Sequence, residues 1–267
     1  MVVIEGREGA AEGCKVLQCQ IRKMRLFSLL YILVCLLGTL CVLLTVFWVQ
    51  KWRGGFAWDG SQMMFNWHPV CMVTGLVVLY GNAALVYRLP FSWVGQKLPW
   101  KLLHAGLTLA AFILSVIGLV AVFAFHNKQQ IPNLYSLHSW LGFTAVLLFS
   151  LQWIAGLCTF LLPLMPVWFR SAYKPIHICF GSAVFVLSLA SAIAGITEKL
   201  MFSLKLSNST AEYSSLPPEA LFANSLGLLI GVFGLLVLWM LSRPSWQRPD
   251  RRVSEARQPL LEEEDGG

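Results

Sequence analysis

Four of the five histidines in this chain of 267 residues recur at nearly even spacing. They are His68, His104, His138 and His177, and the separations between successive ones are 36, 34 and 39 residues. Neutral imidazole is a good ligand for iron and for other transition metals. Each of the four stands near the start of a long apolar run, so their chemistry depends on how those runs are arranged.

Six apolar runs are long enough to cross a bilayer as helices, which takes about 20 residues. The chain is 57% hydrophobic and 12% charged, whereas soluble domains carry about 25% charged residues. We therefore predict an all-α membrane protein with six transmembrane helices. The net charge of +7 does not indicate nucleic acid as a partner, because the basic residues lie between the runs. The predicted spans are residues 26–47, 68–88, 102–125, 137–162, 176–197 and 220–241.

The placement of basic residues predicts the orientation. With the N-terminus in the cytosol, 15 of the 20 Lys and Arg residues fall on the cytosolic side, as the positive-inside rule requires. The glycosylation sequon at Asn208 then falls in the luminal loop 198–219. The predicted organisation is a cytosolic tail (1–25), a six-span domain (26–241) and a cytosolic tail (242–267). The polar stretches 1–24 and 243–267 have the composition of disordered segments.

Alternation of the spans sorts the four histidines into two pairs. His68 and His138 enter from the luminal face, and His104 and His177 enter from the cytosolic face. Two imidazoles that face each other across a helical bundle form a bis-histidine haem site. The second to fifth spans are therefore predicted to form a four-helix bundle that holds two b-type haems and carries electrons across the bilayer.

Three glycines could make room for a porphyrin beside these histidines. Gly142 and Gly181 each follow a histidine by four residues and so share its helix face. Gly75 lies two turns after His68. Transmembrane glycines also let helices approach closely, which is an equally simple explanation of each one.

Two other interpretations of the histidines remain open. A histidine near the end of a span can simply be an interfacial residue, although four in succession, paired by face, make that a poor account. A haem-free, proton-coupled transporter could use them as a relay, because ionisable groups inside a membrane mark such pathways. Relays usually add Asp or Glu inside the spans, and here only Glu198, at a luminal end, comes near. The seven cysteines show no CxxC spacing and indicate no disulfide framework or zinc site.

Several strings in residues 26–241 resemble the cytochrome b561 family of ascorbate-dependent transmembrane oxidoreductases. They are FNWHP (65–69), LVYRLP (85–90), KLPWKLLH (97–104), FHN (125–127), NLYSLHSWLG (133–142) and KPIH (174–177). Within the family, WRGGFAWDGS (52–61), SLPPEALFANS (215–225) and RQPLL (257–261) are most similar to the lysosomal and late-endosomal branch. The resemblance implies six helices and two haems, and it suggests a homodimer.

The resemblance also implies residue roles. His68 with His138 would ligate the luminal haem, and His104 with His177 the cytosolic haem, which agrees with the pairing by face. The residues expected to surround the haems are Asn133, Leu134, Tyr135, Ser136 and Glu198 on the luminal side, with Arg88 and Lys97 at the propionates of the cytosolic haem.

Lys97, Lys101 and Arg170 resemble the family's ascorbate-binding residues. Lys97 and Lys101 are four residues apart and so point to one side of a helix. Ascorbate is an anion at neutral pH, and a basic mouth attracts it. His126, expected in a luminal loop, resembles the residue that engages ferric iron.

These roles imply an ascorbate-dependent ferric reductase of the late endosome or lysosome membrane, with both termini cytosolic. Luminal monodehydroascorbate is the alternative acceptor. The tail departs from the acidic dileucine signal, because Ala256 occupies the position four residues before Leu260 and Glu255 stands one residue further away.

Overall fold

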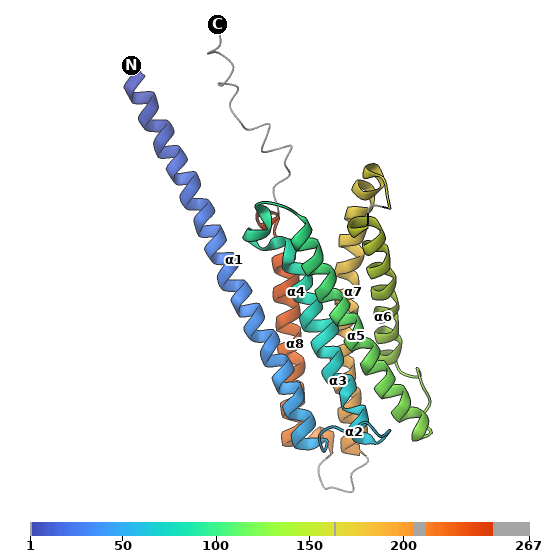
Figure 1. Ribbon diagram of the computed structural model, residues 1–267. Helices are drawn as coiled ribbons and strands as arrows, with labels where there is room; N and C mark the ends of the chain where they lie inside the picture. The colour runs from blue at the N-terminus through green and yellow to red at the C-terminus, as the bar shows by residue number, and fades with distance from the viewer. Residues whose placement is uncertain (1, 163, 206–211, 248–267) are drawn as a thin grey trace.

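A computed structural model describes residues 2–162, 164–205 and 212–247, and all side chains in these ranges except those of residues 2–17 and 205. The described part is helical, and six of its helical segments are long and apolar enough to cross a membrane (Figure 1). The all-α prediction with six spans is therefore confirmed. Asn208 and the dileucine stretch lie outside the described residues.

The main elements are α1 (Val2–Trp52), α2 (Gln62–Phe65), α3 (Trp67–Met72), η1 (Val73–Leu79), α4 (Tyr80–Leu85), η2 (Val86–Arg88), η3 (Pro90–Trp93), α5 (Leu98–Lys128), α6 (Leu137–Gly156), η4 (Leu157–Leu161), α7 (Val167–Lys205), η5 (Tyr213–Ser215), α8 (Pro218–Ser242) and η6 (Pro244–Trp246). The second span runs from α2 through η2 as one nearly continuous rod.

Several predicted spans were shorter than the helices that contain them. The spans were bounded where the apolar sequence ends, whereas the helices continue into polar sequence. The first helix begins at Val2, so the expectation of a disordered stretch over residues 1–24 is wrong for the described part. The fifth span extends to Lys205, which places Glu198 in a helix and not in the loop expected at 198–219. The C-terminal stretch begins with an ordered turn whose Trp246 is buried against Phe27.

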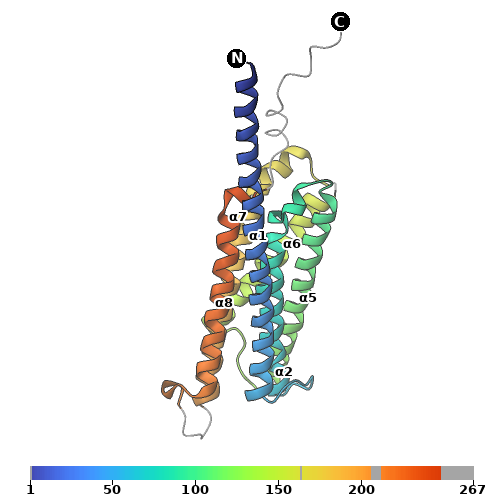
Figure 2. The same cartoon turned by 90° about the vertical axis from the view of Figure 1, so that its left-hand side faces the viewer.

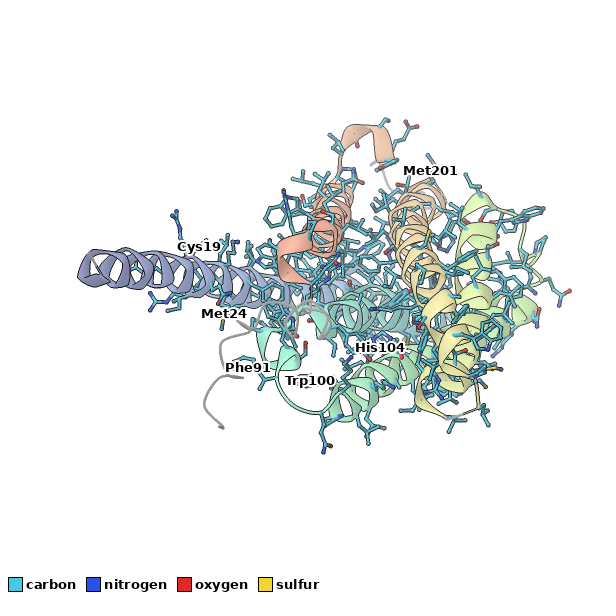
Figure 3. The ribbon with its side chains drawn as sticks, turned by 90° about the horizontal axis from the view of Figure 1, so that it is seen from above. Cys19, Met24, Phe91, Trp100, His104 and Met201 are labelled. Carbon is cyan, nitrogen blue, oxygen red and sulfur yellow. The ribbon has the colours of Figure 1, made fainter. Side chains whose placement is uncertain are left out.

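The second to fifth spans pack around one another, with the first and last helices outside them. The α3 helix contacts α5, and α6 contacts α7, while α1 packs on α8 (Figures 1 and 2). A view along the bundle places His104 toward its interior and Phe91 at its edge (Figure 3). We call the end at which α5 and α7 begin the predicted cytosolic end, and the other the predicted luminal end.

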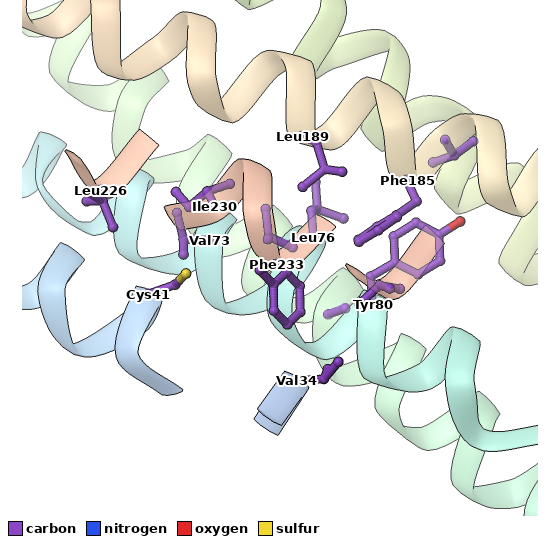
Figure 4. Packing of buried hydrophobic residues seen from close by; sticks show 14 of the residues in the cluster. Val34, Cys41, Val73, Leu76, Tyr80, Phe185, Leu189, Leu226, Ile230 and Phe233 are labelled. Atoms are coloured by element: carbon purple, nitrogen blue, oxygen red, sulfur yellow. The ribbon is translucent and has the colours of Figure 1, made fainter. Parts of the chain in front are cut away.

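An apolar core joins α8 to the second and fifth spans. Phe233 of α8 is fully buried and lies near Tyr80 and Phe185 (Figure 4). Gly81 allows this approach, because a Cβ there would lie 3.1 Å from the Phe233 ring. Tight packing of this kind is what drives helix association in lipid, where apolar burial gives little advantage. The core therefore holds the outer helices against the bundle.

Two segments of π-helix interrupt the spans beside the paired histidines. The first, η1, follows His68 by one turn, and the second, η4, ends the fourth span. A π-segment widens the turn and redirects the residues after it, and such segments are frequent at functional sites. The carbonyl of Phe160 in η4 accepts a hydrogen bond of 2.7 Å from the Lys101 ammonium.

A buried ion pair ties the first span to the last at the predicted luminal end. Arg53 pairs with Glu219 in the first turn of α8, and the Trp48 indole N–H donates to the same carboxylate at 2.8 Å. Burial lowers the pKa of the Arg53 guanidinium to about 10, so it stays charged at neutral pH. The carboxylate is also stabilised by the helix N-terminus.

We expect Glu219→Ala to destabilise the protein by about 3 kcal/mol, because it leaves the Arg53 guanidinium buried without a counter-charge. Thermal unfolding of the purified protein in detergent measures the loss. Glu212→Ala, at an exposed carboxylate in the same connection, should leave the unfolding temperature unchanged. An equal and small effect of both changes would contradict the structural role of the pair.

Candidate functional site

The first pair of imidazoles lies at the predicted luminal end. The rings of His68 on α3 and His138 on α6 have centroids 6.0 Å apart. His68 Nδ1 is 3.2 Å from the carbonyl oxygen of Gly118, and His138 Nδ1 is 2.8 Å from that of Ser191. Because a carbonyl only accepts hydrogen bonds, each Nδ1 carries the proton, and Nε2 keeps its lone pair for a metal.

The second pair lies toward the predicted cytosolic end. The ring centroids of His104 on α5 and His177 on α7 are 6.3 Å apart. His104 Nδ1 is 2.9 Å from the carbonyl oxygen of Ala83, which again leaves Nε2 free. His177 Nδ1 is buried and has no hydrogen-bond partner among the residues that the structure describes. Phe160 and Tyr173 lie beside the His177 ring, at centroid distances of 5.3 and 6.0 Å.

Both separations fit one iron atom between two imidazoles. Metal–nitrogen bonds of about 2 Å on either side of an iron place the two ring centres roughly 6 Å apart. Among the described residues, no group of three or more His, Cys, Asp or Glu side chains could hold a metal ion. Each pair offers two imidazoles, the number of ligands that a metal already held by the four pyrrole nitrogens of haem still requires.

A cavity of about 790 Å³ surrounds the luminal pair. Both His68 and His138 line it, and most of its other lining is apolar, including Leu76, Phe123 and Phe143. Cofactor sites are typically concave, mainly apolar and of about 300–1,000 Å³. The cavity therefore suits a large and mostly apolar cofactor.

The glycines that lie closest to the imidazole rings are not the ones that their spacing from the histidines in the sequence indicated. A Cβ on Gly195 would lie 2.6 Å from Cε1 of His138, and one on Gly156 would lie 3.1 Å from Cε1 of His177. Gly75 and Gly181 instead face the Ala111 carbonyl and the Gln152 amide of neighbouring helices. Both glycines therefore lie at helix contacts, which is the simpler of the two explanations that the sequence offers.

Gly142 fits both explanations considered for these glycines, which are space beside a histidine and close helix contact. It lines the cavity, and a Cβ there would lie 2.8 Å from the hydroxyl of Ser191. The Ser191 hydroxyl is 3.2 Å from His138 Nδ1, and the backbone carbonyl of Ser191 accepts a hydrogen bond from the same nitrogen. The small residues Ser188, Ser191 and Gly195 on α7 are spaced by three and four, a helical pattern that could have identified this face from sequence.

Of the four residues Asn133 to Ser136, three line the cavity: Leu134, Tyr135 and Ser136. Asn133 does not, and instead its side-chain oxygen lies 3.2 Å from Nδ1 of His126. His126 is in the last turn of α5, so the expectation that it lies in a loop is wrong. The amide oxygen accepts from Nδ1, which leaves Nε2 of His126 free.

The rim of the cavity at the predicted luminal end carries both signs of charge. Glu198 lines it, and its carboxylate acts electrostatically on His126 and Tyr135. Burial is the larger influence on the Tyr135 hydroxyl, and both effects raise its pKa. Lys199 and Arg53 also line the cavity, and sequence reasoning gave neither a role there.

Basic residues converge at the predicted cytosolic end. The Lys101 ammonium lies close enough to Arg170 and Lys97 to feel their charges. Arg170 is held by a hydrogen bond of 2.7 Å from its Nε to the carbonyl of Met165. Lys97, immediately before α5, is exposed. The three cations that sequence analysis assigned to ascorbate are therefore neighbours.

Arg88 has different partners from those expected. Its guanidinium donates to the carbonyl oxygens of Leu241, at 2.5 Å, and Arg243, at 3.0 Å. These carbonyls end α8, where a cation is favoured by the helix dipole. In this structure Arg88 caps the last helix, and its contact with a propionate stays a prediction.

Comparison with known proteins adds evidence independent of this geometry. A family model described as eukaryotic cytochrome b561 matches residues 67–203. The lysosomal membrane ascorbate-dependent ferrireductase CYB561A3 of Homo sapiens is 61% identical over 235 residues, which cover 88% of this chain and 96% of that protein. The protein of the same name from Danio rerio is 57% identical, with 84% and 91% covered. The plasma membrane ascorbate-dependent reductase CYBRD1 of Xenopus tropicalis is 48% identical, with 86% and 80% covered.

We expect Gly195→Ala to reduce haem binding, because the added methyl displaces the His138 ring with which it would collide. The haem-to-protein ratio of the purified protein, from its visible absorption, measures the effect. Gly106→Ala is the matched control, since nothing lies within 4 Å of a Cβ at that helical glycine. Full haem content in the Gly195 variant would contradict the close fit around His138.

Proposed function

This chain belongs to the eukaryotic cytochrome b561 family, and on that premise we propose that it transfers electrons across a membrane from cytosolic ascorbate to luminal ferric iron. The family match and the similarity to ascorbate-dependent ferrireductases support this reaction. The finer elements of the proposal are two haems per chain, the residues that hold them, the luminal acceptor and the side on which each substrate binds.

One observation carries the proposal: two imidazole pairs lie toward opposite ends of the same helical bundle, with centroids 6.0 and 6.3 Å apart. A single pair could serve a structural or sensory role. Two pairs at different depths place a redox centre near each membrane face, as transfer across a bilayer requires. The intervening core is apolar and packed, with Tyr80 and Phe185 inside it.

The protein supplies ligands, orientation and a dry environment. When bound, haem contributes an iron that cycles between the ferric and ferrous states by one electron. His68 with His138, and His104 with His177, would be the axial ligands. The backbone carbonyls of Gly118, Ser191 and Ala83 hold three of these four rings in one tautomer and one orientation.

The donor side is an anion-binding mouth. Lys97, Lys101 and Arg170 place positive charge above the end of the bundle that contains the second pair. Such a mouth raises the local concentration of an anion and steers it inward. Ascorbate is an anion that gives up one electron at a time, leaving the monodehydroascorbate radical, so its charge and its chemistry suit this site.

The acceptor side offers a ligand for iron. His126 lies at the luminal rim of the cavity, and its Nε2 is free because Nδ1 donates to Asn133. Neutral imidazole binds iron well. Ferric iron is the proposed acceptor, and monodehydroascorbate is the alternative that the same assay can test.

Location and assembly complete the proposal. The similarity to lysosomal membrane proteins supports a late-endosomal or lysosomal membrane, and the basic residues support cytosolic termini. A homodimer is proposed from family resemblance alone. A haem-free transporter would show no visible absorption, whereas bis-histidine haem has sharp bands when reduced.

Proteoliposomes test the function directly. With ferric chelate inside and ascorbate outside, molecules whose cytosolic face points outward should produce ferrous iron inside, while liposomes that contain a His104→Ala, His177→Ala variant should not. Loading monodehydroascorbate in place of iron tests the other acceptor. Purified wild-type protein without haem bands, or no transfer to either acceptor in vesicles of controlled orientation, would overturn the proposal.

We expect Lys101→Met to raise the KM for ascorbate about tenfold, because an ionic hydrogen bond to the anion is lost. The kcat should change less, since the haem ligands are untouched. Lys101→Arg keeps the charge and should restore most of the affinity. Lys23→Met removes an exposed cation from α1 and should have no effect. Unchanged ascorbate kinetics in Lys101→Met would contradict the assignment.

A further inference from the structure

The cavity at the luminal pair is amphipathic along its depth. Its inner part is lined by apolar side chains of the second, third and fifth spans, such as Leu76, Val77 and Phe123. Its charged lining gathers at the predicted luminal end, where α1 and α5 end and α7 approaches its own end. These rim residues are Arg53, His126, Glu198 and Lys199. An occupant that fits this cavity has an apolar body and a charged edge.

Lys199 lies at this rim, one aromatic ring away from His68. Its ammonium lies 4.0 Å from the centroid of the Phe65 ring, and that ring is 5.9 Å from the ring of His68. Cations are attracted to aromatic faces, but a ring cannot neutralise a charge. Within the described part of the chain, no carboxylate lies within ion-pair distance of Lys199. The neighbouring Glu198 acts instead on His126 and Tyr135.

Arg53 adds a second positive charge behind Lys199. One of its terminal nitrogens pairs with Glu219, which holds the guanidinium in place. Its Nε is buried and has no hydrogen-bond partner among the described residues. Arg53 and Lys199 line the same cavity, and the Arg53 charge acts on Lys199. A half-buried cation such as Lys199, which has no carboxylate partner in the part of the chain that the structure describes, favours a bound anion.

We propose that Lys199, with Arg53 behind it, binds a propionate carboxylate of the haem held by His68 and His138. The inference rests on the proposed function and names the residues that hold the charged edge of the cofactor. Haem has an apolar macrocycle and two carboxylates on one edge, which matches an apolar cavity with a cationic rim. The carboxylate completes the hydrogen bonding of Lys199 and compensates its charge.

This contact has an electrostatic consequence for the iron. A fixed positive charge near a redox centre stabilises the state that carries the extra electron, and burial strengthens the effect. Lys199 therefore raises the midpoint potential of the luminal haem and favours its reduction from the cytosolic side. Neutralising Lys199 lowers that potential and loosens the cofactor, and the potential of the cytosolic haem stays unchanged.

The experiment compares purified, haem-loaded wild type with Lys199→Met and Lys51→Met. Lys51 is a matched control because its ammonium also lies over an aromatic ring, 4.7 Å from the centroid of Trp52, at the same end but exposed. Spectroscopic redox titration gives the two midpoint potentials, and transfer to an apo-globin scavenger gives the rate of haem loss. Lys199→Met should lower one potential and lose one haem roughly tenfold faster.

The other outcomes separate the possible roles of Lys199. Restoration by Lys199→Arg, together with normal retention of the cytosolic haem, supports a charge contact and excludes general misfolding. If Lys199→Met keeps both potentials and both retention rates, the inference is overturned. If it changes only the KM for ferric citrate, Lys199 binds the acceptor, which also overturns it. Wild type without haem bands would instead overturn the proposed function, and the inference with it.

Discussion

The carbonyl oxygens of Gly118, Ser191 and Ala83 turn imidazoles on neighbouring helices so that two pairs of rings face each other. Each hydrogen bond fixes which nitrogen carries the proton, and therefore which nitrogen can bind iron. The partner carbonyls belong to other spans, so each ring is oriented only when the helices are packed in one register. Small residues such as Gly195 and Gly156 allow the rings to lie there. The geometry of the candidate redox site therefore depends directly on the helix packing.

Charge is distributed unequally between the two ends of the helical bundle. At the predicted cytosolic end the charges of Lys97 and Arg170 act on Lys101, and all three are positive. At the predicted luminal end the charges of both signs are largely buried, and the Arg53–Glu219 pair also joins the first and last helices. An exposed cation attracts an anion from solution, whereas a buried one needs a permanent partner. We propose a substrate site at the first end and a cofactor site at the second.

Hydrophobic run length and histidine spacing were sufficient to predict the six spans and the two histidine pairs, because both depend on the fixed thickness of a bilayer. Boundaries were less predictable. The α7 helix continues to Lys205 and brings Glu198 and Lys199 to the cavity rim, since backbone hydrogen bonding favours continuing a helix beyond its apolar part. The same cause moved His126 from an expected loop into the end of α5.

What the sequence by itself determined is a membrane protein with an imidazole near the start of each of its four central spans, because apolarity and residue spacing are properties of the chain alone. Only the tertiary structure decided which glycines contact the rings, that Arg88 caps α8 and that Asn133 holds His126. These contacts join residues on different helices. They depend on the rotation and register of each helix against its neighbours, which side-chain packing sets and no periodicity within one helix encodes.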